Sequence, residues 1–492
     1  MHRVAVFASF NLIAYSVALT IPIGGICMKR LVFCFDGTWN TLSAPLPTNV
    51  VVTAESVVPI ASDGTAQVIH YDEGVGTAKW EQIRGGVFGF GLVDNIADAY
   101  RFLIFNYTPG DEIYVFGFSR GAYTARSFAG LMSNCGILHR SQAAKATEAI
   151  ERYRAREDSD AYREAMMKFR AACAPDVCLS QAEEMWRVNN LAGYAKDSAH
   201  RLRVTYVGVW DTVGALGIPA RFTLLSAFNR KHRFHDASLS AFVRSARHAV
   251  AIDERRKDFV PTLWDNLEKL TADAGASYDS EDAPYQQKWF PGTHSSVGGG
   301  GDRRGLSDQA LEWVLDGARH IGLQLDKSPH SPIFRLRPDA NDYLEDSEKP
   351  GLMYRAMNAV ASADRTPGPS RLFEVSMSAR KRWKEKPDKL KDKVPYRPAT
   401  LNRVADALNA LSDTDVGLHA AALKPEDFDP YDVQRGDNLT KIAIAKYGDG
   451  SLWPVIYEAN RDKLENPNRI YIGQVLRIPR RPQAANELEE EK

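Results

Sequence analysis

The chain has 492 residues, which is too long for one small hydrophobic core and predicts two or three domains. Lysine plus arginine number 62, as do aspartate plus glutamate, and this balance argues against a nucleic-acid-binding protein. The hydrophobic fraction of 44% and the charged fraction of 25% are those of a globular protein.

The N-terminal tract, residues 4–27, carries no charged side chain and is long enough for a signal peptide or a membrane anchor. Ser16-Val17-Ala18 would be the cleavage site of a signal peptide. A third interpretation is that the natural protein starts at Met28, because an apolar strand follows at once. Residues 1–27 would then belong to an over-extended reading frame, and the sequence leaves these alternatives open.

The cysteines show no metal-ligand spacing, so we expect reduced thiols and no metal site. They are Cys27, Cys34, Cys135, Cys173 and Cys178. A bridge between Cys173 and Cys178 is the alternative for a protein that works outside the cytoplasm.

The first predicted strand covers residues 31–35, a short apolar run typical of a central parallel strand. It leads into Asp36, Gly37 and Thr38. An Asp-Gly-Thr sequence after an apolar strand is also typical of haloacid-dehalogenase phosphatases, but these need an aspartate nucleophile where this chain has Cys34. The sequence therefore disfavours a phosphatase, and we expect Asp36 to be a reserve or supporting residue.

Residues 111–131 carry the strongest functional signal in the chain. An apolar strand at 113–116 is followed by Gly117-Phe118-Ser119-Arg120-Gly121 and then by small and apolar residues at helical spacing. A serine at the apex of such a turn, with glycine two residues to either side, is typical of the nucleophile elbow of α/β-hydrolases. This pattern predicts Ser119 as a nucleophile; a glycine-rich turn with a surface serine is the alternative.

A serine hydrolase also needs backbone N–H groups that hold the oxyanion of the reaction intermediate. We expect the N–H of Arg120, directly after the nucleophile, to be one of them. The loop after the first strand would supply the other, from Gly37 or Thr38.

Residues 139–200 are rich in alanine, glutamate, arginine and lysine, with apolar residues at helical spacing. They interrupt the expected alternation of strands and helices. This insertion is predicted to form either a helical cap that controls access to the active site or a solvated helical decoration.

The acid and the base of a catalytic triad are expected after later strands. The strand at 203–210 ends in Asp211, where this fold places its triad acid; a plain Asp turn is the alternative. His294 follows an apolar strand end and precedes a glycine run, so we expect it on a flexible loop as the general base. The order Ser119, Asp211, His294 is that of α/β-hydrolases. The stretch 248–256 offers His248 and Asp253 as a reserve base and acid, or as supporting residues.

Five motifs, taken together and in this order, resemble the α/β-hydrolase family that includes type VI secretion lipase effectors. The motifs are Phe-Asp-Gly-Thr-Trp-Asn (35–40), Gly-Phe-Ser-Arg-Gly-Ala (117–122), Val-Trp-Asp-Thr-Val (209–213), His-Ala-Val-Ala-Ile-Asp-Glu-Arg-Arg (248–256) and Phe-Pro-Gly-Thr-His (290–294) with its glycine run. The resemblance covers about residues 29–403. It implies a phospholipase A-type ester hydrolase with Ser119 as nucleophile, His294 as base and Asp211 as acid. The family usually has Asp two residues after the His, where this chain has Ser296, so support of His294 from that position is in doubt.

A separate unit follows at residues 431–480, in which two short strands enclose two amphipathic helices. This βααβ pattern, with Gly436-Asp437 near its start and Ile478-Pro479 at its end, resembles the LysM domain. The resemblance implies binding of N-acetylglucosamine-containing glycans, here peptidoglycan, in a groove between two loops. The predicted groove residues are Gly436, Asp437, Asn438, Leu439, Asn466, Pro467 and Ile470, whereas Trp453 and Ile456 are expected in the core.

The predicted organisation is an apolar tract (1–27), an α/β-hydrolase domain (28–403), a linker (404–429), a LysM domain (430–481) and a disordered tail (482–492). We expect a serine ester hydrolase without metal or cofactor, held near its envelope substrates by the glycan-binding module. A type VI secretion component and an immunity protein are expected partners, with action at the bacterial cell envelope or in a target-cell periplasm. An esterase on non-lipid substrates and a non-catalytic wall-binding protein are the alternatives.

Overall fold

The structure is a computed structural model that describes residues 28–37, 42, 44–74, 88–214, 238–326, 328, 331–344, 363–413, 415–416, 428–460, 463–464, 467 and 469–479. The predictions for residues 1–27, for Thr38, for Asn466 and for the tail lie outside these residues. Among the described residues, no helix is both long enough and apolar enough to cross a membrane.

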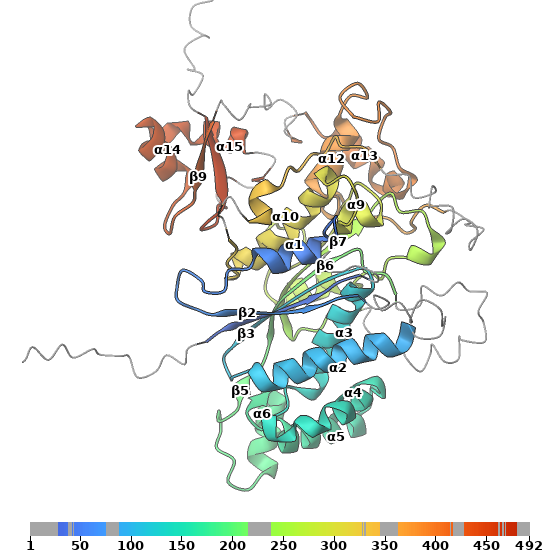
Figure 1. Ribbon diagram of the computed structural model, residues 1–492, viewed down its shortest axis with the longest axis vertical. Coiled ribbons are helices and arrows are strands. Elements are labelled where there is room, and N and C mark those ends of the chain that lie inside the picture. The colour runs from blue at the N-terminus through green and yellow to red at the C-terminus, as the bar shows by residue number, and fades with distance from the viewer. Residues whose placement is uncertain are drawn as a thin grey trace, which may run out of the picture.

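A six-stranded parallel sheet forms the centre of the larger domain, with the strand order β2-β1-β3-β6-β7-β8 (Figure 1). Every residue of β1 and β6 is buried. This agrees with the sequence, in which apolar runs predict central strands at these positions. The strands are β1 (Arg30–Phe35), β2 (Gln67–Asp72), β3 (Glu112–Phe118), β6 (Val204–Trp210), β7 (Val243–Ala251) and β8 (Tyr285–Phe290). The predicted α/β-hydrolase-type fold class is confirmed.

Helices cover both faces of the sheet, and alternate residues of each strand face opposite layers. In β1, Leu31, Phe33 and Phe35 pack in the core of α2 (Phe88–Asn106) and α3 (Arg120–Cys135). The intervening Val32 and Cys34 pack in the core of α1 (Asn49–Ser56) and α10 (Gly305–His320). The three-layer arrangement leaves the carboxyl ends of the strands free to carry functional loops.

The insertion packs beside α2 and α3 and not over the carboxyl ends of the strands (Figure 1). It starts after the end of α3 and returns to the start of β6, both at the amino ends of the strands. Its elements are η2 (Arg140–Lys145), α4 (Ala146–Arg154), α5 (Asp160–Cys173), β4 (Val177–Cys178), α6 (Gln181–Asn190) and β5 (His200–Arg201). The prediction of a cap over Ser119 is therefore wrong, because the insertion is attached at the opposite end of the sheet. Cys173 and Cys178 are free thiols, as are Cys34 and Cys135.

A C-terminal layer packs on β7 and β8 at the edge of the sheet. Buried Val375, Trp383 and Leu401 share a core with Val250 and Trp289 of these strands. The layer comprises η6 (Leu372–Glu374), α12 (Met377–Lys384), η7 (Ala399–Val404) and α13 (Ala405–Ala410). Leu408 of α13 is buried in this same core, so the layer extends past the predicted boundary at residue 403. Smaller elements nearby are η4 (Lys257–Phe259), α8 (Leu267–Asp273), α9 (His294–Gly298) and η5 (Pro332–Arg335).

The C-terminal module has the predicted βααβ order. Its antiparallel strands β9 (Phe428–Asp432) and β10 (Val475–Pro479) enclose α14 (Leu439–Tyr447), η9 (Gly450–Leu452) and α15 (Trp453–Ala459). Ile456 is fully buried in the module's own core, against which Trp453 packs, as expected. Arg469 donates to the carbonyl oxygen of Glu281 over 2.6 Å and forms an ion pair with Asp282.

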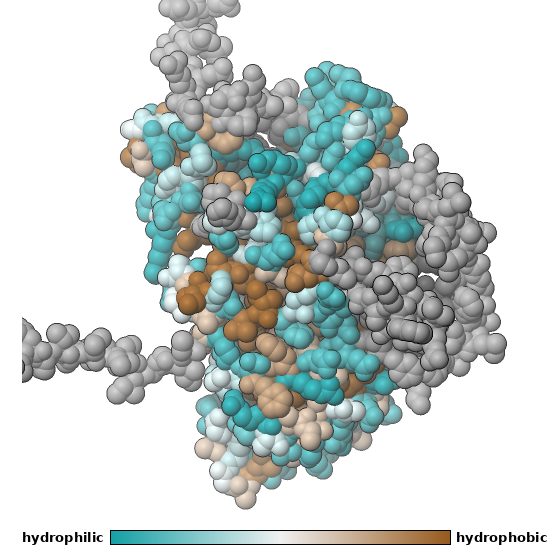
Figure 2. All heavy atoms as spheres, viewed as in Figure 1, coloured by the Kyte–Doolittle hydropathy of each residue, from teal (hydrophilic) through white to brown (hydrophobic). Residues whose placement is uncertain are grey.

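The surface beside α1 and β2 is hydrophobic, in contrast to the largely hydrophilic C-terminal layer (Figure 2). Ile60, between α1 and β2 in sequence, is 68% exposed. Phe334 of η5, which packs against α1, is 48% exposed. These side chains lie on the face of the sheet that α1 and α10 cover.

Candidate active site

The strand–turn–helix around Ser119 has the strained geometry of a nucleophile elbow. Ser119 has φ 60° and ψ −123°, in a region that L-residues rarely adopt. A Cβ at Gly117 would lie 2.5 Å from the carbonyl oxygen of Gly121, and a Cβ at Gly121 would lie 2.2 Å from that of Phe35. Both glycines are therefore required by the close approach of β1, β3 and α3.

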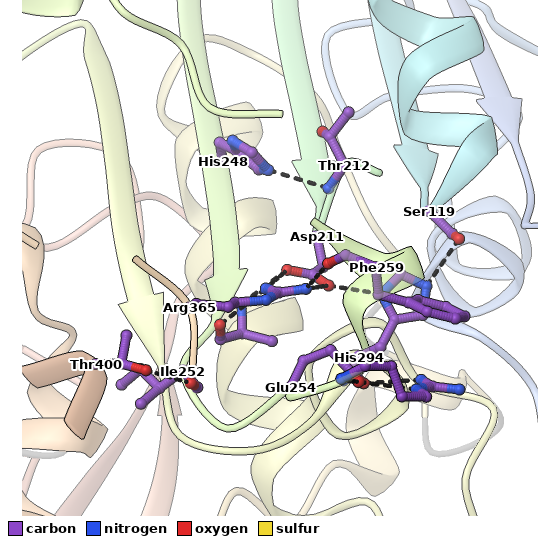
Figure 3. A network of polar contacts seen from close by, with 12 residues as sticks. Ser119, Asp211, Thr212, His248, Ile252, Glu254, Phe259, His294, Arg365 and Thr400 are labelled. Carbon is purple, nitrogen blue, oxygen red and sulfur yellow. Dashed lines mark hydrogen bonds and ion pairs between the residues drawn. The ribbon is translucent and has the colours of Figure 1, made fainter. Parts of the chain in front are cut away.

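Three side chains from the carboxyl ends of β3, β6 and β8 form one hydrogen-bonded chain (Figure 3). His294 Nε2 lies 2.7 Å from Ser119 Oγ, and His294 Nδ1 lies 2.6 Å from Asp211 Oδ2. Because a carboxylate only accepts, Nδ1–H donates to Asp211, and Nε2 accepts from the hydroxyl of Ser119. This is the arrangement in which a histidine can take the proton of an attacking serine.

His294 is held by its neighbours rather than by a flexible loop. It starts the short helix α9, and its backbone N–H donates to the buried carboxylate of Glu254 over 3.2 Å. Its ring lies between Phe118 and Phe259, with ring centroids at 4.6 and 4.8 Å. Burial lowers the pKa of His294 below its ordinary value, against the opposing effect of Asp211. The imidazole is thereby kept neutral, as a base requires.

Ser296 does not support His294 in the way its position suggested. Its hydroxyl lies 3.1 Å from that of Thr293. The carboxylate that holds the backbone of His294 comes instead from Glu254, which also pairs with Arg256 over 2.7 Å. The backbone of His294 is thus held from the loop after β7.

Asp211 is fully buried and accepts hydrogen bonds from several directions. The backbone N–H of Ala251 donates to Oδ1 over 2.9 Å, and Arg365 contacts both oxygens at 2.5 and 2.9 Å. Burial alone would raise the pKa of Asp211, but the charges of Arg365 and His294 outweigh it and hold the pKa well below its usual range. These contacts favour the anionic form of Asp211.

Arg365 was not among the residues predicted from the sequence. It lies 154 positions after Asp211, and no motif surrounds it. A buried arginine on a connecting segment has no periodicity that would mark it in advance. Contacts between segments far apart in the chain bring its guanidinium to Asp211.

Asp36 organises the loop after β1. The backbone N–H of Gly37 donates over 2.6 Å to the side chain of Asp36. Asp36 also accepts from the hydroxyls of Thr48 and Tyr71 at 2.7 and 2.9 Å. The N–H of Gly37 would have to leave Asp36 to bind an oxyanion, and this role of Gly37 stays a prediction. Arg120 is the first residue of α3, and its N–H as oxyanion donor stays a prediction.

The reserve residues His248 and Asp253 hold the backbone and do not touch Ser119 in the described contacts. His248 accepts from the N–H of Thr212 over 3.2 Å and contacts Gln287 at 2.9 Å, and burial lowers its pKa to about 3. Asp253 accepts from the N–H of Gly292 and the hydroxyl of Tyr396 at 2.7 and 2.9 Å. His248 thus stabilises the strand end at Asp211, and Asp253 stabilises the strand end before His294.

Most of the described residues of the predicted glycan groove have structural contacts of their own. The carboxylate of Asp437 accepts from Tyr431 and from the N–H of Gln434, and Asn438 caps α14 through Lys441 N–H. Leu439 is 2% exposed and belongs to the module's core, so its side chain is not available to a ligand. Gly436 has φ 87° at the turn, and Pro467 and Ile470 are partly exposed on the facing loop. Glycan contact by these residues stays a prediction.

Residues 29–317 match the family described as "T6SS, Phospholipase effector Tle1-like, catalytic domain", which is more than half of the chain. The chain belongs to this family. Residues 431–479 match the LysM domain. The Tle1-like domain is a hydrolase domain, and its match ends before the C-terminal layer.

Individual relatives share only parts of this Tle1-like chain. An uncharacterized protein of Saccharomyces cerevisiae is 26% identical over 249 residues, which is 47% of this chain and 32% of that protein. The potassium binding protein Kbp of Escherichia coli is 49% identical over 49 residues, 10% of this chain and 33% of Kbp. The chain thus spans about a third of the length of these two relatives. A solved structure of the Tle1 effector bound to the VgrG spike has a TM-score of 0.28 at 18% identity and covers 56% of this chain and 51% of that one.

No group of three or more metal-ligating side chains in metal-binding arrangement occurs among the described residues.

Proposed function

We propose that the protein is a serine ester hydrolase of the phospholipase A type. The observation that carries this proposal is the chain of contacts from Ser119 through His294 to Asp211, at 2.7 and 2.6 Å. Membership of the Tle1-like phospholipase effector family supports an acyl ester of a membrane phospholipid as the substrate.

The reaction proceeds in two stages. Ser119 Oγ attacks the ester carbonyl carbon while His294 Nε2 takes the hydroxyl proton, and Asp211 stabilises the imidazolium. His294 then gives this proton to the leaving alkoxide, which departs as a lysophospholipid and leaves an acyl-serine. In the second stage, water loses a proton to His294 and attacks the acyl-serine, which releases a fatty acid and restores Ser119. The N–H of Arg120 is proposed to stabilise the oxyanion in both stages.

The LysM module is proposed to hold the enzyme at peptidoglycan by binding N-acetylglucosamine-containing glycans. Such a tether raises the local concentration of enzyme at envelope lipids without a new contact in the active site. The type VI secretion context of the family supports delivery through a secretion component, and a matching immunity protein in the producing cell. Action at the cell envelope or in a target-cell periplasm follows from these two proposals.

The decisive experiment measures fatty-acid release from vesicles of bacterial phospholipids by protein that starts at Met28. The parent is expected to release fatty acid, and Ser119→Ala to reduce release by about 10⁴-fold or more. Ser133→Ala is the matched control, because this serine lies on α3 and bonds only to the helix carbonyl of Gly130 in the described contacts.

Other outcomes would redirect the proposal. Turnover of short soluble esters without release from vesicles would leave a serine esterase with a non-lipid substrate. A Ser119→Ala variant as active as Ser133→Ala would exclude Ser119 as nucleophile. No turnover of either substrate would leave a wall-binding protein on a hydrolase scaffold.

A further inference from the structure

The positively charged side chain of Arg365 contacts the carboxylate of Asp211, the proposed acid of the triad. Its guanidinium contacts Oδ1 and Oδ2 of Asp211 at 2.5 and 2.9 Å, and its side chain is only 4% exposed. This arginine lies beyond residues 29–317, the part of the chain that matches the catalytic family.

We propose that Arg365 is a positioning residue of the active site, which fixes Asp211 against His294 and sets the pH range in which His294 acts as a base. The proposal rests on the serine hydrolase function proposed above. It extends the functional unit beyond residue 317, where the family match ends.

The geometry argues for positioning because Arg365 is itself fixed. Its two terminal nitrogens also donate to the carbonyl oxygens of Ala251 and Phe259, at 2.8 and 2.7 Å. The planar guanidinium therefore holds the carboxylate of Asp211 in one orientation, with Oδ2 towards His294 (Figure 3). A single Lys ammonium cannot reproduce this set of contacts.

The neighbouring segment fixes the backbone of Arg365 as well. The N–H of Ala363 donates to the carbonyl oxygen of Arg255 over 2.9 Å. Asp364 pairs with the side chain of Arg255 over 3.0 Å. These contacts attach the segment to the loop that also carries Glu254, the partner of the His294 backbone.

The electrostatic argument concerns the proton affinity of the Asp211–His294 pair. Around the pair lie the positive charges of Arg365 and Arg256, the carboxylate of Glu254, and His248, which itself lies near Arg126. Removal of a positive charge raises the proton affinity of the pair, whichever member takes the proton. Without Arg365, His294 would therefore lose its basic form at a higher pH.

Two variants separate the charge of Arg365 from its geometry. Arg365→Met removes the charge and the hydrogen bonds. Arg365→Lys keeps the charge but loses the bidentate contact with the carboxylate of Asp211. Arg187→Met is the matched control: Arg187 is also fully buried, donates to the carbonyls of Pro175 and Val177, and pairs with Glu183 over 2.8 Å, but it lies in the insertion.

The full-length variants are compared by the pH dependence of kcat and kcat/KM on a soluble ester. Arg365→Met should lower kcat by about 10²-fold and move the acid limb of kcat/KM up by about one pH unit or more. Arg365→Lys should lower kcat while its acid limb stays near that of the parent. Arg187→Met should lower thermal stability without moving the acid limb of the kcat/KM profile.

An unmoved acid limb in Arg365→Met, with a loss of kcat no larger than in Arg187→Met, would overturn the proposal. If Arg365→Met does not fold, parent-like kcat in Arg365→Lys would overturn the positioning role. An NMR pH titration of the His294 ring, assigned with His294→Gln, separates this inference from the proposed function. An inactive parent whose His294 still titrates higher in Arg365→Met would reject only the hydrolase proposal.

Discussion

The ring of His294 lies between two aromatic side chains and carries one polar partner at each nitrogen. This enclosure disfavours the charged imidazolium, so burial lowers the pKa of His294. The Asp211 anion opposes this effect but does not cancel it. The net effect favours the neutral form of His294, which is the form that a general base requires.

The first prediction concerns the pH dependence of ester turnover. Only neutral His294 can accept the proton of Ser119, so kcat/KM should rise with pH through the pKa of His294. Because this pKa is lowered, the acid limb should lie below the ordinary histidine value of about 6.5. The profile is measured with a soluble ester between about pH 4 and 9. A limb clearly above pH 7 would contradict the assignment of His294 as the base.

The second prediction concerns Gly121, where a methyl group would lie 2.2 Å from the carbonyl oxygen of Phe35 and 2.4 Å from that of Asp36. Because these backbone atoms can shift only at a large cost in free energy, Gly121→Ala should lower the free energy of unfolding by about 3 kcal/mol. Urea denaturation measures the loss. Gly64→Ala is the control, since Gly64 has positive φ but an open surrounding, and it should lose only about 1 kcal/mol.

At the scale of single residues, the sequence predicts a position correctly where the local backbone geometry requires a particular residue type. Ser119 between two glycines, Asp211 after β6 and His294 after β8 could be placed because their strands are short apolar runs. Arg365 and Glu254 could not, because their partners are fixed by packing between distant segments. The sequence also does not reveal that the N–H of Gly37 donates to the side chain of Asp36.

The loops after β7 and β8 are joined to each other and to the C-terminal layer. Asp253, after β7, accepts from Gly292, after β8, and from Tyr396 of the layer. Burial raises the pKa of Asp253 to about 6, against the effect of these hydrogen bonds and of Arg382. These contacts hold the strand end from which α9 presents His294.

The third prediction is a decrease in stability with pH that depends on Asp253. The folded state favours its protonated form, whose pKa is about 6, whereas the unfolded value is about 3.9. The folded state therefore binds one more proton between these values, and stability should fall by about 3 kcal/mol as pH rises from about 4 to 6. Asp253→Asn should remove this decrease in stability. The measurement is a series of chemical denaturation curves recorded at pH values from about 4 to 6. Asp273→Asn, at the exposed end of α8, should keep the slope of the parent; an equal slope in Asp253→Asn would reject the prediction.

At the scale of elements, the predicted strands of the sheet and the βααβ module agree with the structure, because both follow from hydrophobic periodicity. The prediction of a cap was wrong for a different reason. Helical spacing indicates that residues 139–200 form helices, but it carries no information on the end of the sheet to which they attach.

The whole molecule consists of a larger domain, whose final layer shares a core with the sheet, and a small module with a core of its own. The hydrolase core includes Val375, Trp383 and Leu401, which lie far beyond the family match and cover Trp289 and Val250. The LysM core contains only residues from its own strands, helices and loops.

The fourth prediction compares two C-terminal truncations. A chain ending at Leu344 lacks the buried side chains of the layer, each of which contributes about 2 kcal/mol, and their sum exceeds the usual stability of a domain. This protein should not give a cooperative unfolding transition. A chain ending at Asp413 should keep one. Calorimetry or circular dichroism distinguishes them, and a stable chain ending at Leu344 would contradict the assignment of the layer to the hydrolase domain.

The fifth prediction separates the two activities. The chain ending at Asp413 should hydrolyse a soluble ester within about two-fold of the full protein, because the triad and Arg365 are retained. It should no longer sediment with insoluble peptidoglycan. Ser119→Ala in the full chain should behave in the opposite way, with binding retained and turnover lost. Glycan binding by the truncated chain would place the wall-binding site outside the module.

The insertion has a consequence for how the protein can be remodelled. Both of its ends join the sheet at the amino ends of strands, and its buried side chains Ile150, Tyr153 and Phe169 belong to the same core as β1 and α3. Removal of the whole insertion would therefore expose apolar side chains of α2 and α3. A reporter or another binding domain is better placed within an exposed turn of the insertion, such as residues 155–158, where no core side chain would be lost.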